Sequence, residues 1–334
     1  MNRILLILKG MAMGAADVVP GVSGGTIAFI TGIYEELIDS IRSIDGRAIK
    51  ILFSEGPFAF WKAINGNFLI SVFGGIAISV LGLSKLITYL LEHEAVLLWS
   101  FFFGLILASI FMVAQGIGQW KKRVIAGMIL GSLVSFYVTI ATPTQSPDGS
   151  FYLFFYGFLA IIAMILPGIS GAFILLLLGA YGTIIQTVNN FRTALGDVDM
   201  AALGTNGLKI LIFMLGCLAG LMAFSRVLSW MFKHYKDTTL AMLTGFMIGS
   251  LNKIWPWKET VVSRVAHQGK PEEAIVPFIQ ENVWPWNYTE LNDVEKLLSV
   301  LPEKDPEILA SVMVMTAGVI LMIILNRHSP ENGA

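Results

Sequence analysis

The chain has 334 residues, of which 55% are hydrophobic and 13% are charged, and its mean hydropathy is +0.73. These values exclude a water-soluble domain for most of the chain, because the apolar blocks are longer than a buried core helix needs. The net charge is −1 and the basic residues are scattered over connecting segments, so we expect no binding to nucleic acid. The single cysteine, Cys217, gives no intrachain disulfide and no thiolate metal site, and we expect neither a metal nor a cofactor.

The first apolar segment, residues 4–38, is divided by Pro20-Gly21. Because Lys9 interrupts its apolar start and no convincing cleavage site follows, we expect the N-terminus to be retained as structure and not removed as a signal peptide. Proline lacks a backbone donor and glycine leaves the backbone open. The segment should therefore form a pair of short helices instead of one span.

The later apolar segments include spans and a second divided segment. A helix that crosses a hydrocarbon core of about 30 Å needs about 20 apolar residues. Residues 151–188 are broken by Pro167-Gly168 in the same way as the first segment, and residues 239–254 form a short span. The longer uninterrupted spans are expected at residues 68–91, 95–115, 124–141, 208–232 and 309–325.

The two divided segments are related in sequence. Setting VVPGVSGGTIAFITGIYEELI against ILPGISGAFILLLLGAYGTII aligns matching residues at a constant offset, and the similarity continues downstream at a second offset. We interpret the chain as a duplication. The aligned pairs include Pro20 with Pro167, Ser23 with Ser170, Tyr34 with Tyr181, Gly75 with Gly216, Lys85 with Arg226, and Gly104 with Gly245.

These observations predict an all-α polytopic membrane protein with two repeats of inverted topology. If each divided segment is a re-entrant hairpin that returns to its own side, each repeat adds about three crossings, and an odd number inverts the second repeat. The first repeat is expected at residues 1–141 and the second at residues 150–326. An extracytoplasmic insertion, residues 258–307, should lie within the second repeat, beside two Trp-Pro-Trp sequences that suit an aromatic belt.

The distribution of Lys and Arg indicates the sidedness. The short connections on one side, residues 92–94 and 142–150, contain neither residue. Because cytoplasmic loops are enriched in Lys and Arg, the opposite side and both termini are expected in the cytoplasm. The basic residues on that side are Arg3, Lys9, Arg42, Arg47, Lys50, Lys62, Lys121, Lys122, Arg123, Lys233, Lys236 and Arg327.

The two breaks form the candidate substrate site. Glycines let a substrate approach the backbone, a serine hydroxyl can donate a hydrogen bond, and the half-helix that follows turns its N–H groups toward the break. This combination suits an anion, above all a phosphate, near the midplane between repeats. The alternative is that small residues only allow tight helix packing. The candidate phosphate-binding residues at the breaks are Pro20, Gly21, Ser23, Gly24, Gly25, Thr26, Pro167, Gly168, Ser170 and Gly171.

Four charged residues are further candidates. Lys85 and Arg226 occupy equivalent positions in apolar helices, where a cation is costly without a partner, so they are candidate counter-charges for phosphate. The alternative is that both extend to opposite interfaces. Asp17, which aligns with Met164, is a candidate for proton coupling, and capping of the following half-helix is the alternative. Glu35 is a second proton-coupling candidate, with a solvated helix end as the alternative.

A resemblance to the bacterial polyprenyl-phosphate transporter family is carried by GAADVVPGVSGGTIAFITGIYEELI, ILPGISGAFILLLLGAYG and GFMIGSLNKIWPWK. It covers nearly the entire chain. The resemblance implies a flippase of the bacterial cytoplasmic (inner) membrane that returns undecaprenyl phosphate, the lipid carrier of cell-wall and surface-glycan precursors, from the outer to the inner leaflet. It implies polyprenyl phosphate and membrane phospholipids as partners, makes the paired Pro-Gly-x-Ser-Gly motifs functional positions, and leaves the oligomeric state open.

Two other functions compete with this interpretation. Undecaprenyl-pyrophosphate phosphatases also use inverted repeats, with a Pro-Gly-x-Ser-Arg-Ser-Gly motif, but here Gly24 and Gly171 directly follow the motif serines and no carboxylate pair precedes either motif. Phosphoryl cleavage without positioned cationic or metal assistance is difficult. A small-anion carrier would use the same helix ends around a narrow hydrated pore.

Overall fold

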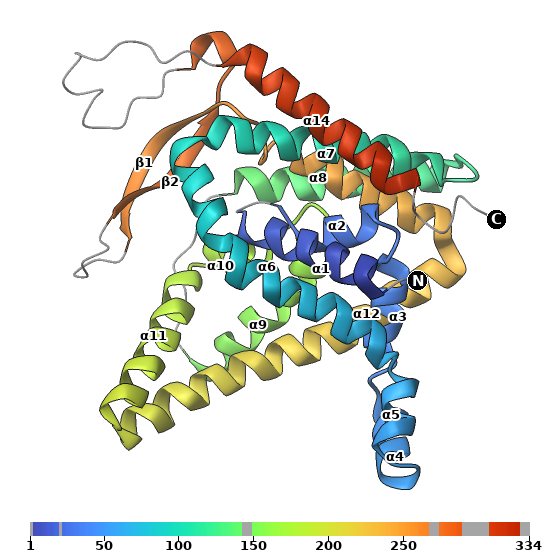
Figure 1. Cartoon of the computed structure of the whole chain (residues 1–334), viewed down its shortest axis with the longest axis vertical. Coiled ribbons are helices and arrows are strands. Elements are labelled where there is room, and N and C mark those ends of the chain that lie inside the picture. Colours follow the sequence, from blue (N-terminus) through green and yellow to red (C-terminus); the bar gives the residue numbers. More distant parts are fainter. Residues whose placement is uncertain (1–2, 20–21, 142–148, 267–273, 289–306, 328–334) are drawn as a thin grey trace.

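The computed structural model describes residues 3–19, 22–141, 149–266, 274–288 and 307–327. The described chain is mostly helical (Figure 1). Its helices are α1 (Arg3–Val18), α2 (Gly24–Ile30), α3 (Tyr34–Arg42), α4 (Gly46–Ser54), α5 (Pro57–Ala63), α6 (Gly66–His93), α7 (Ala95–Gln115), α8 (Lys122–Ile140), α9 (Ser150–Ile165), α10 (Gly171–Leu177), α11 (Tyr181–Asp197), α12 (Met200–Ser250) and α14 (Ile308–Arg327).

Several of these helices are consistent with a polytopic membrane protein. Among the described residues, α6, α7, α8 and α12 each contain a stretch long and apolar enough to cross a bilayer. The predicted span at residues 95–115 coincides with α7. Helix α12 has 51 residues and joins the predicted spans 208–232 and 239–254, and Tyr235, with φ −139° and ψ 45°, divides them. Figure 1 shows α12 reversing its direction in this region.

Each divided segment folds as three helices and not as the expected pair, because a further break follows at Gly32 (φ +70°) in the first segment and at Gly179 (φ +69°) in the second. The first gives α1, α2 and α3, and the second gives α9, α10 and α11. Helices α10 and α11 meet at an angle of 108°, as a broken span or a re-entrant loop would. Pro20 and Gly21 lie outside the described residues. Gly168 has a φ of +85°, which favours glycine at the second break.

Corresponding helices of the two halves pack alike. Helix α1 begins at Arg3 and α9 begins 147 residues later, at Ser150 (150 − 3 = 147). A Cβ added to Gly75 of α6 would collide with the carbonyl oxygen of Ile7, and a Cβ added to Gly216 of α12 would collide with that of Phe154. The two glycines are aligned in sequence, and Ile7 and Phe154 are separated by the same 147 positions (154 − 7 = 147) as the starts of α1 and α9. Helix α1 therefore packs on α6 as α9 packs on the first part of α12.

The two halves also exchange helices. Helix α14 packs along α7, as Figure 1 shows, and α8 packs along α12. The close approaches again occur at aligned glycines, because Gly104 of α7 meets the backbone of Met315 and Gly245 of α12 meets the backbone of Met128. The last helix of each half thus lies against a helix of the other half, and the halves form one interleaved bundle.

The expectation of an all-α chain is wrong in the insertion. Strands β1 (Lys258–Ala266) and β2 (Ala274–Asn282) pair antiparallel, and a 3₁₀ helix, η1 (Pro285–Asn287), follows them. The β-branched residues of these segments favour strands, a local signal that the hydropathy of the chain does not carry. Trp255 contacts both Trp257 and Trp284 through ring edges, while residues 289–306 of the expected insertion lie outside the described residues.

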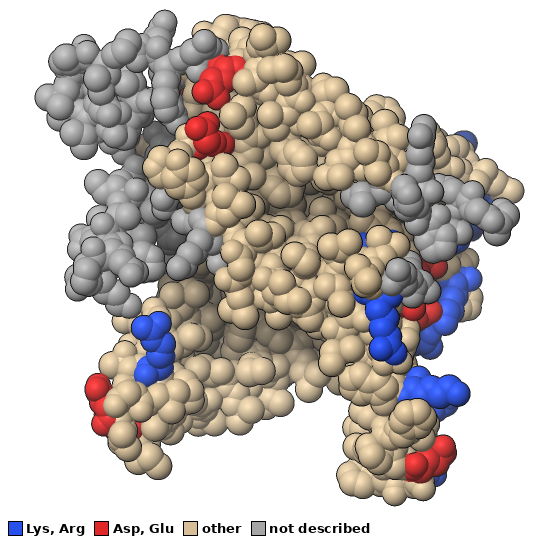
Figure 2. Space-filling model, viewed as in Figure 1, with Lys and Arg blue, Asp and Glu red and all other residues tan. Residues whose placement is uncertain are grey.

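The core is centred on the first broken segment, and the outer helix faces are apolar. Ile33, Tyr34 and Ile38 of this region are each at most 2% exposed. Exposed apolar side chains such as Leu81, at 82%, suit contact with lipid. On the face drawn in Figure 2, most Lys and Arg side chains lie on the side that carries α4 and α5.

Candidate functional site at the two helix breaks

Ser23 joins the first break to the second. It is the N-cap of α2, with φ −125° and ψ 134°, and its Oγ accepts a hydrogen bond from the Gly25 N–H at 3.1 Å. The same hydroxyl donates to the carbonyl oxygen of Met164 at 2.9 Å, near the end of α9. Gly25 leaves no room for a side chain, because an added Cβ would lie 2.5 Å from the carbonyl oxygen of Ile165. A small residue is therefore needed where the breaks touch.

Asp17 closes the N-terminal end of α2. Its Oδ1 accepts a hydrogen bond from the Gly24 N–H at 2.7 Å. A Cβ on Gly24 would lie 2.5 Å from the Asp17 Oδ2, so the carboxylate occupies the space in front of the half-helix. This is the capping geometry that the sequence left as the alternative for Asp17. The first break thus has an anion of its own, supplied by the chain.

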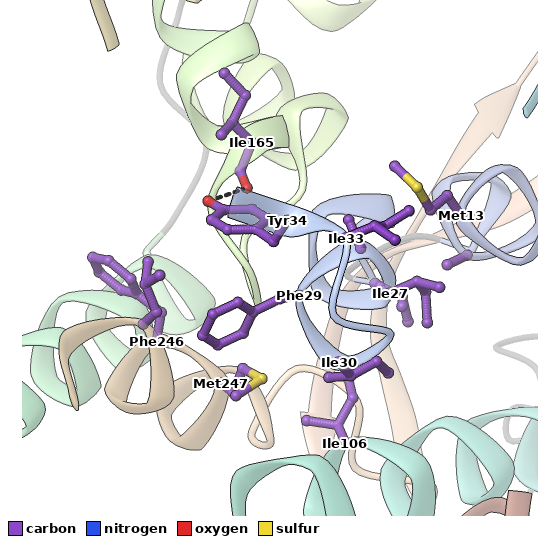
Figure 3. Close-up of a cluster of buried hydrophobic side chains, with 14 of the residues drawn as sticks. Met13, Ile27, Phe29, Ile30, Ile33, Tyr34, Ile106, Ile165, Phe246 and Met247 are labelled. Carbon is purple, nitrogen blue, oxygen red and sulfur yellow. Dashed lines mark hydrogen bonds between the residues drawn. The ribbon is translucent and has the colours of Figure 1, made fainter. Parts of the chain in front are cut away.

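Two more side chains of the first half satisfy backbone groups of the second break. The Gly168 N–H donates a hydrogen bond to Thr26 Oγ1 at 2.8 Å, and Thr26 is fully buried. Tyr34 donates from its hydroxyl to the carbonyl oxygen of Ile165 at 3.0 Å, and Figure 3 shows its ring pointing to that oxygen from α3. Breaks at membrane depth leave backbone groups that need such partners. The sequence predicts neither contact with the second break, because it marks Thr26 only as a candidate phosphate-binding residue and indicates no role for Tyr34.

Ser170 behaves differently from its counterpart Ser23. It is the N-cap of α10 and is 8% exposed, but its side chain makes no capping hydrogen bond. Gly171, which follows it, is packed with its Cα facing the carbonyl oxygen of Ala160. The second break therefore retains a hydroxyl group that can bind a ligand. The two motifs are alike in sequence and unlike in their hydrogen bonding.

The structure does not bring Arg226 to either break. Its side chain is exposed, and its guanidinium donates to the carbonyl oxygen of Met222 in its own helix at 3.2 Å. The Asp45 carboxylate accepts hydrogen bonds from backbone N–H groups of α4, and these, above all the bond from Ala48, lower its pKa. The positive charge of Arg226 lowers this pKa further. Arg226 therefore lies near the α3–α4 connection, as the interface alternative expects. Lys85 lies in α6, and its side chain is outside the described residues.

Glu35 lines a pocket between α3 and α12. The pocket has a volume of about 240 Å³ and also contains Asp39 and Lys233. Glu35 pairs with Lys236 at 3.8 Å, and Asp39 pairs with Lys233 at 3.8 Å. These side chains are about half exposed. The pocket is thus a charged cavity at the junction of the two halves, and it contains none of the Pro-Gly motif residues. Its remaining lining residues are Ile38, Ser229 and Phe232.

Sequence reasoning missed the contacts of two polar residues. Lys9 is 4% exposed, and its Nζ donates to the carbonyl oxygen of Thr31 at 2.6 Å, at the end of α2. Ser229 bridges α3 to α12, because its Oγ donates to Asp39 at 2.6 Å and accepts from Arg42 at 2.9 Å. The position of Lys9 inside an apolar stretch was a signal for a buried partner. No local signal pointed to Ser229.

The fold and the site together define a class of protein. The chain is a multi-pass membrane protein in which two broken helical segments, one from each half, are joined at their breaks, as in transporters that bind substrates at discontinuous helices. Residues 13–271 match the family described as undecaprenyl phosphate translocase-like, and the chain belongs to this family.

Two relatives agree with this membership. The polyprenyl-phosphate transporter of Vibrio cholerae serotype O1 is 41% identical over 331 residues, which cover 99% of this chain and 98% of the relative. The polyprenyl-phosphate transporter of Staphylococcus aureus is 34% identical over 264 residues, which cover 75% of this chain and 85% of the relative. No solved structure matches the chain.

Proposed function

We propose that this protein moves polyprenyl phosphate from the outer to the inner leaflet of the bacterial cytoplasmic membrane. Two relatives are named for transport of this lipid. The observation that carries the proposal is the junction of the two breaks, formed by the Ser23–Met164 and Gly168–Thr26 hydrogen bonds. The phosphate head group binds at this junction, while the isoprenoid tail stays among the apolar helix faces.

The proposed topology is a pair of inverted repeats with both termini in the cytoplasm. The constant offset between α1 and α9, and the exchange of α8 and α14 between halves, support a two-fold relation between the repeats. The basic residues around α4 and α5 support a cytoplasmic position for that side (Figure 2). Strands β1 and β2 then face the outside. In this arrangement α1–α3 and α9–α11 enter from opposite leaflets.

Coupling to protons would overcome the membrane potential. An anion that moves inward works against a potential that is negative inside, at about 2.3 kcal/mol per charge per 100 mV. Uptake of one proton with the phosphate offsets one unit of this charge and reduces the opposition accordingly. Asp17 at the first break and Glu35 in the pocket are the carboxylates proposed for this role. Of the two, Asp17 lies at the junction of the breaks.

The test is inter-leaflet movement of polyprenyl phosphate in proteoliposomes that contain the full chain. Release of inorganic phosphate is followed in the same samples, as is the flux of small anions such as chloride. Movement of the lipid without phosphate release or ion flux is the expected result. Phosphate release would instead favour the phosphatase-like alternative, and ion flux without lipid movement would favour the small-anion carrier.

A further inference from the structure

Two lysines lie beside the second break and belong to neither Pro-Gly motif. Lys253 follows α12, and Lys258 begins β1, so they flank the Trp255-Pro256-Trp257 sequence. The Nζ of Lys258 donates a hydrogen bond to the carbonyl oxygen of Lys253 at 2.5 Å. This contact closes residues 253–258 into a tight loop, so that the side chain of Lys258 lies beside the backbone of Lys253. The sequence alone separates them by five positions and gives no reason to pair them.

Each ammonium group lies over an aromatic ring. The Nζ of Lys258 is 3.7 Å from the ring centroid of Trp99 in α7, and the Nζ of Lys253 is 4.4 Å from that of Phe173 in α10. Such contacts position a cation without neutralising its charge. Trp257 is 4% exposed and packs with Val96 of α7, so the loop is fixed against the bundle. The two cations are therefore held in place by neighbouring helices.

This loop is adjacent to the second break. Phe173, under Lys253, is the third residue of α10, which begins directly after Ser170. On the other side, a Cβ on Gly168 would lie 2.6 Å from the carbonyl oxygen of Phe246 and 2.9 Å from Ser250 Oγ. The end of α12 therefore runs along the break and continues into the lysine loop.

The two lysines have no acidic partner within the described part of the chain, where every ion pair involves other residues. Burial lowers the pKa of Lys253. Burial, followed by repulsion from Lys253, holds the pKa of Lys258 well below its usual range. Burial and mutual repulsion therefore disfavour the charged forms of the two lysines in the empty site. An anion between the lysines would favour the charged forms.

We propose that Lys253, Lys258 and Ser170 form the site that first receives the phosphate of the lipid, at the end of the molecule that carries β1 and β2. A phosphate monoester carries a charge of about −1.5 to −2 at neutral pH and has three acceptor oxygens. Lysine binds phosphate as a point charge, and the Ser170 hydroxyl adds a neutral donor. The inference rests on the proposed function. It places the first phosphate contact at the second break alone, because the Asp17 carboxylate already occupies the first break.

The test is a binding titration of the full chain in nanodiscs of neutral phosphatidylcholine. The probes are geranylgeranyl monophosphate, the uncharged geranylgeraniol, and inorganic phosphate; a parallel series uses phosphatidylglycerol as a competing anionic lipid. The variants are Lys253→Gln and Lys258→Gln. Lys209→Gln is the matched control, because Lys209 is exposed near the start of α12, whereas the loop follows the end of that helix. Lys258→Arg keeps the charge and serves as the second variant if Lys258→Gln does not fold.

Each glutamine variant should weaken binding of geranylgeranyl monophosphate about tenfold, the effect of losing one charged hydrogen bond. Lys209→Gln and Lys258→Arg should bind within about twofold of wild type, and geranylgeraniol should bind equally to all variants. Unchanged binding in both glutamine variants would overturn the proposal. Equal competition by phosphatidylglycerol, or by inorganic phosphate at the same concentration, would overturn it as a site for this lipid.

Transport measured with the same preparations separates the two proposals. If wild type binds the probe through the lysines but moves no lipid between leaflets, the proposed function fails and the binding site remains. If wild type moves the lipid and the glutamine variants both bind and transport normally, only the lysine site fails.

Discussion

The hydroxyl of Ser23 donates a hydrogen bond to the carbonyl oxygen of Met164, 2.9 Å away and 141 positions further along the chain. Met164 is the residue that aligns with Asp17 in the second half. The first motif thus has a carboxylate that caps its own half-helix and a serine that binds the second motif, while Ser170 makes neither contact. Two motifs of nearly the same sequence therefore differ in their hydrogen bonding, and the proposed ligand-binding role falls to Ser170 and not to Ser23.

The first prediction is that the two motif serines differ in their effect on stability. Ser23→Ala removes an N-cap and leaves the Met164 carbonyl without this partner, which should cost about 2 kcal/mol. Ser170→Ala removes no hydrogen bond of the described chain and should melt near wild type, yet lower the rate of lipid movement. Thermal unfolding in detergent, followed by tryptophan fluorescence, measures the first effect, and proteoliposome transport measures the second.

The matched control for the serine pair is Ser71→Ala. Ser71 is buried in α6, but its hydroxyl bonds only to the carbonyl oxygen of Asn67 in its own helix. Its replacement should change the melting temperature less than Ser23→Ala does. Equal melting temperatures for Ser23→Ala and Ser170→Ala would contradict the asymmetry.

The second prediction concerns Asp17 and separates capping from proton coupling. Asp17→Asn keeps an oxygen that can accept the Gly24 N–H, so the protein should melt close to wild type. Asp17→Ala loses the cap and should be destabilised by about 1 kcal/mol or more. If Asp17 carries the proton, transport by Asp17→Asn should no longer respond to an imposed pH gradient. A gradient response equal to that of wild type would eliminate Asp17 as the coupling group.

Sequence reasoning located the helices better than the contacts between them. Hydropathy and the Pro-Gly breaks predicted the two divided segments, and the span at residues 95–115 is helix α7. The strand pair was missed because a short β-branched pattern is weak beside long apolar helices. The roles of Tyr34 and Lys258 depend on partners more than 100 positions away, Ile165 and Trp99, which no local pattern contains. Capping of the following half-helix is the alternative role that the sequence indicates for Asp17, and the fold shows this cap at the Gly24 N–H.

The third prediction uses the repeated helix packing. Gly75→Ala and Gly216→Ala each force a Cβ onto a backbone carbonyl, of Ile7 and Phe154, which cannot move aside easily. Overpacking of this kind costs about 1–3 kcal/mol, and the two variants should melt alike because they are equivalent contacts. Gly74→Ala is the control, since a Cβ there has open space. Alanine is favoured over glycine within a helix, so Gly74→Ala should melt at or above wild type. Intact stability in Gly75→Ala would show that the α1–α6 packing is looser than described.

The fourth prediction is that the ion pairs between α3 and α12 close the charged pocket with little effect on overall stability. Asp39 binds Ser229 and pairs with Lys233, but both charged side chains are at least half exposed. Such pairs contribute about 0–1 kcal/mol and are screened by salt. Asp39→Asn should therefore melt near wild type. It should nevertheless open the junction of α3 with α12 more often, because a contact between the two halves is weakened.

Cysteine accessibility measures this opening. Ile38 lines the pocket and is 1% exposed, so Ile38→Cys in a Cys217→Ala background should react slowly with a membrane-impermeant thiol reagent. Adding Asp39→Asn should raise the reaction rate several-fold. High salt should raise the rate more in the background protein than in the variant, which keeps only the Glu35–Lys236 pair of the described ion pairs between α3 and α12. Asp45→Asn, which removes a carboxylate outside the pocket, is the control. If Asp39→Asn and Asp45→Asn give the same labelling rate, the ion pairs do not hold the pocket closed. In that case the apolar packing of Tyr34 against Phe232 must keep the two halves together on this side.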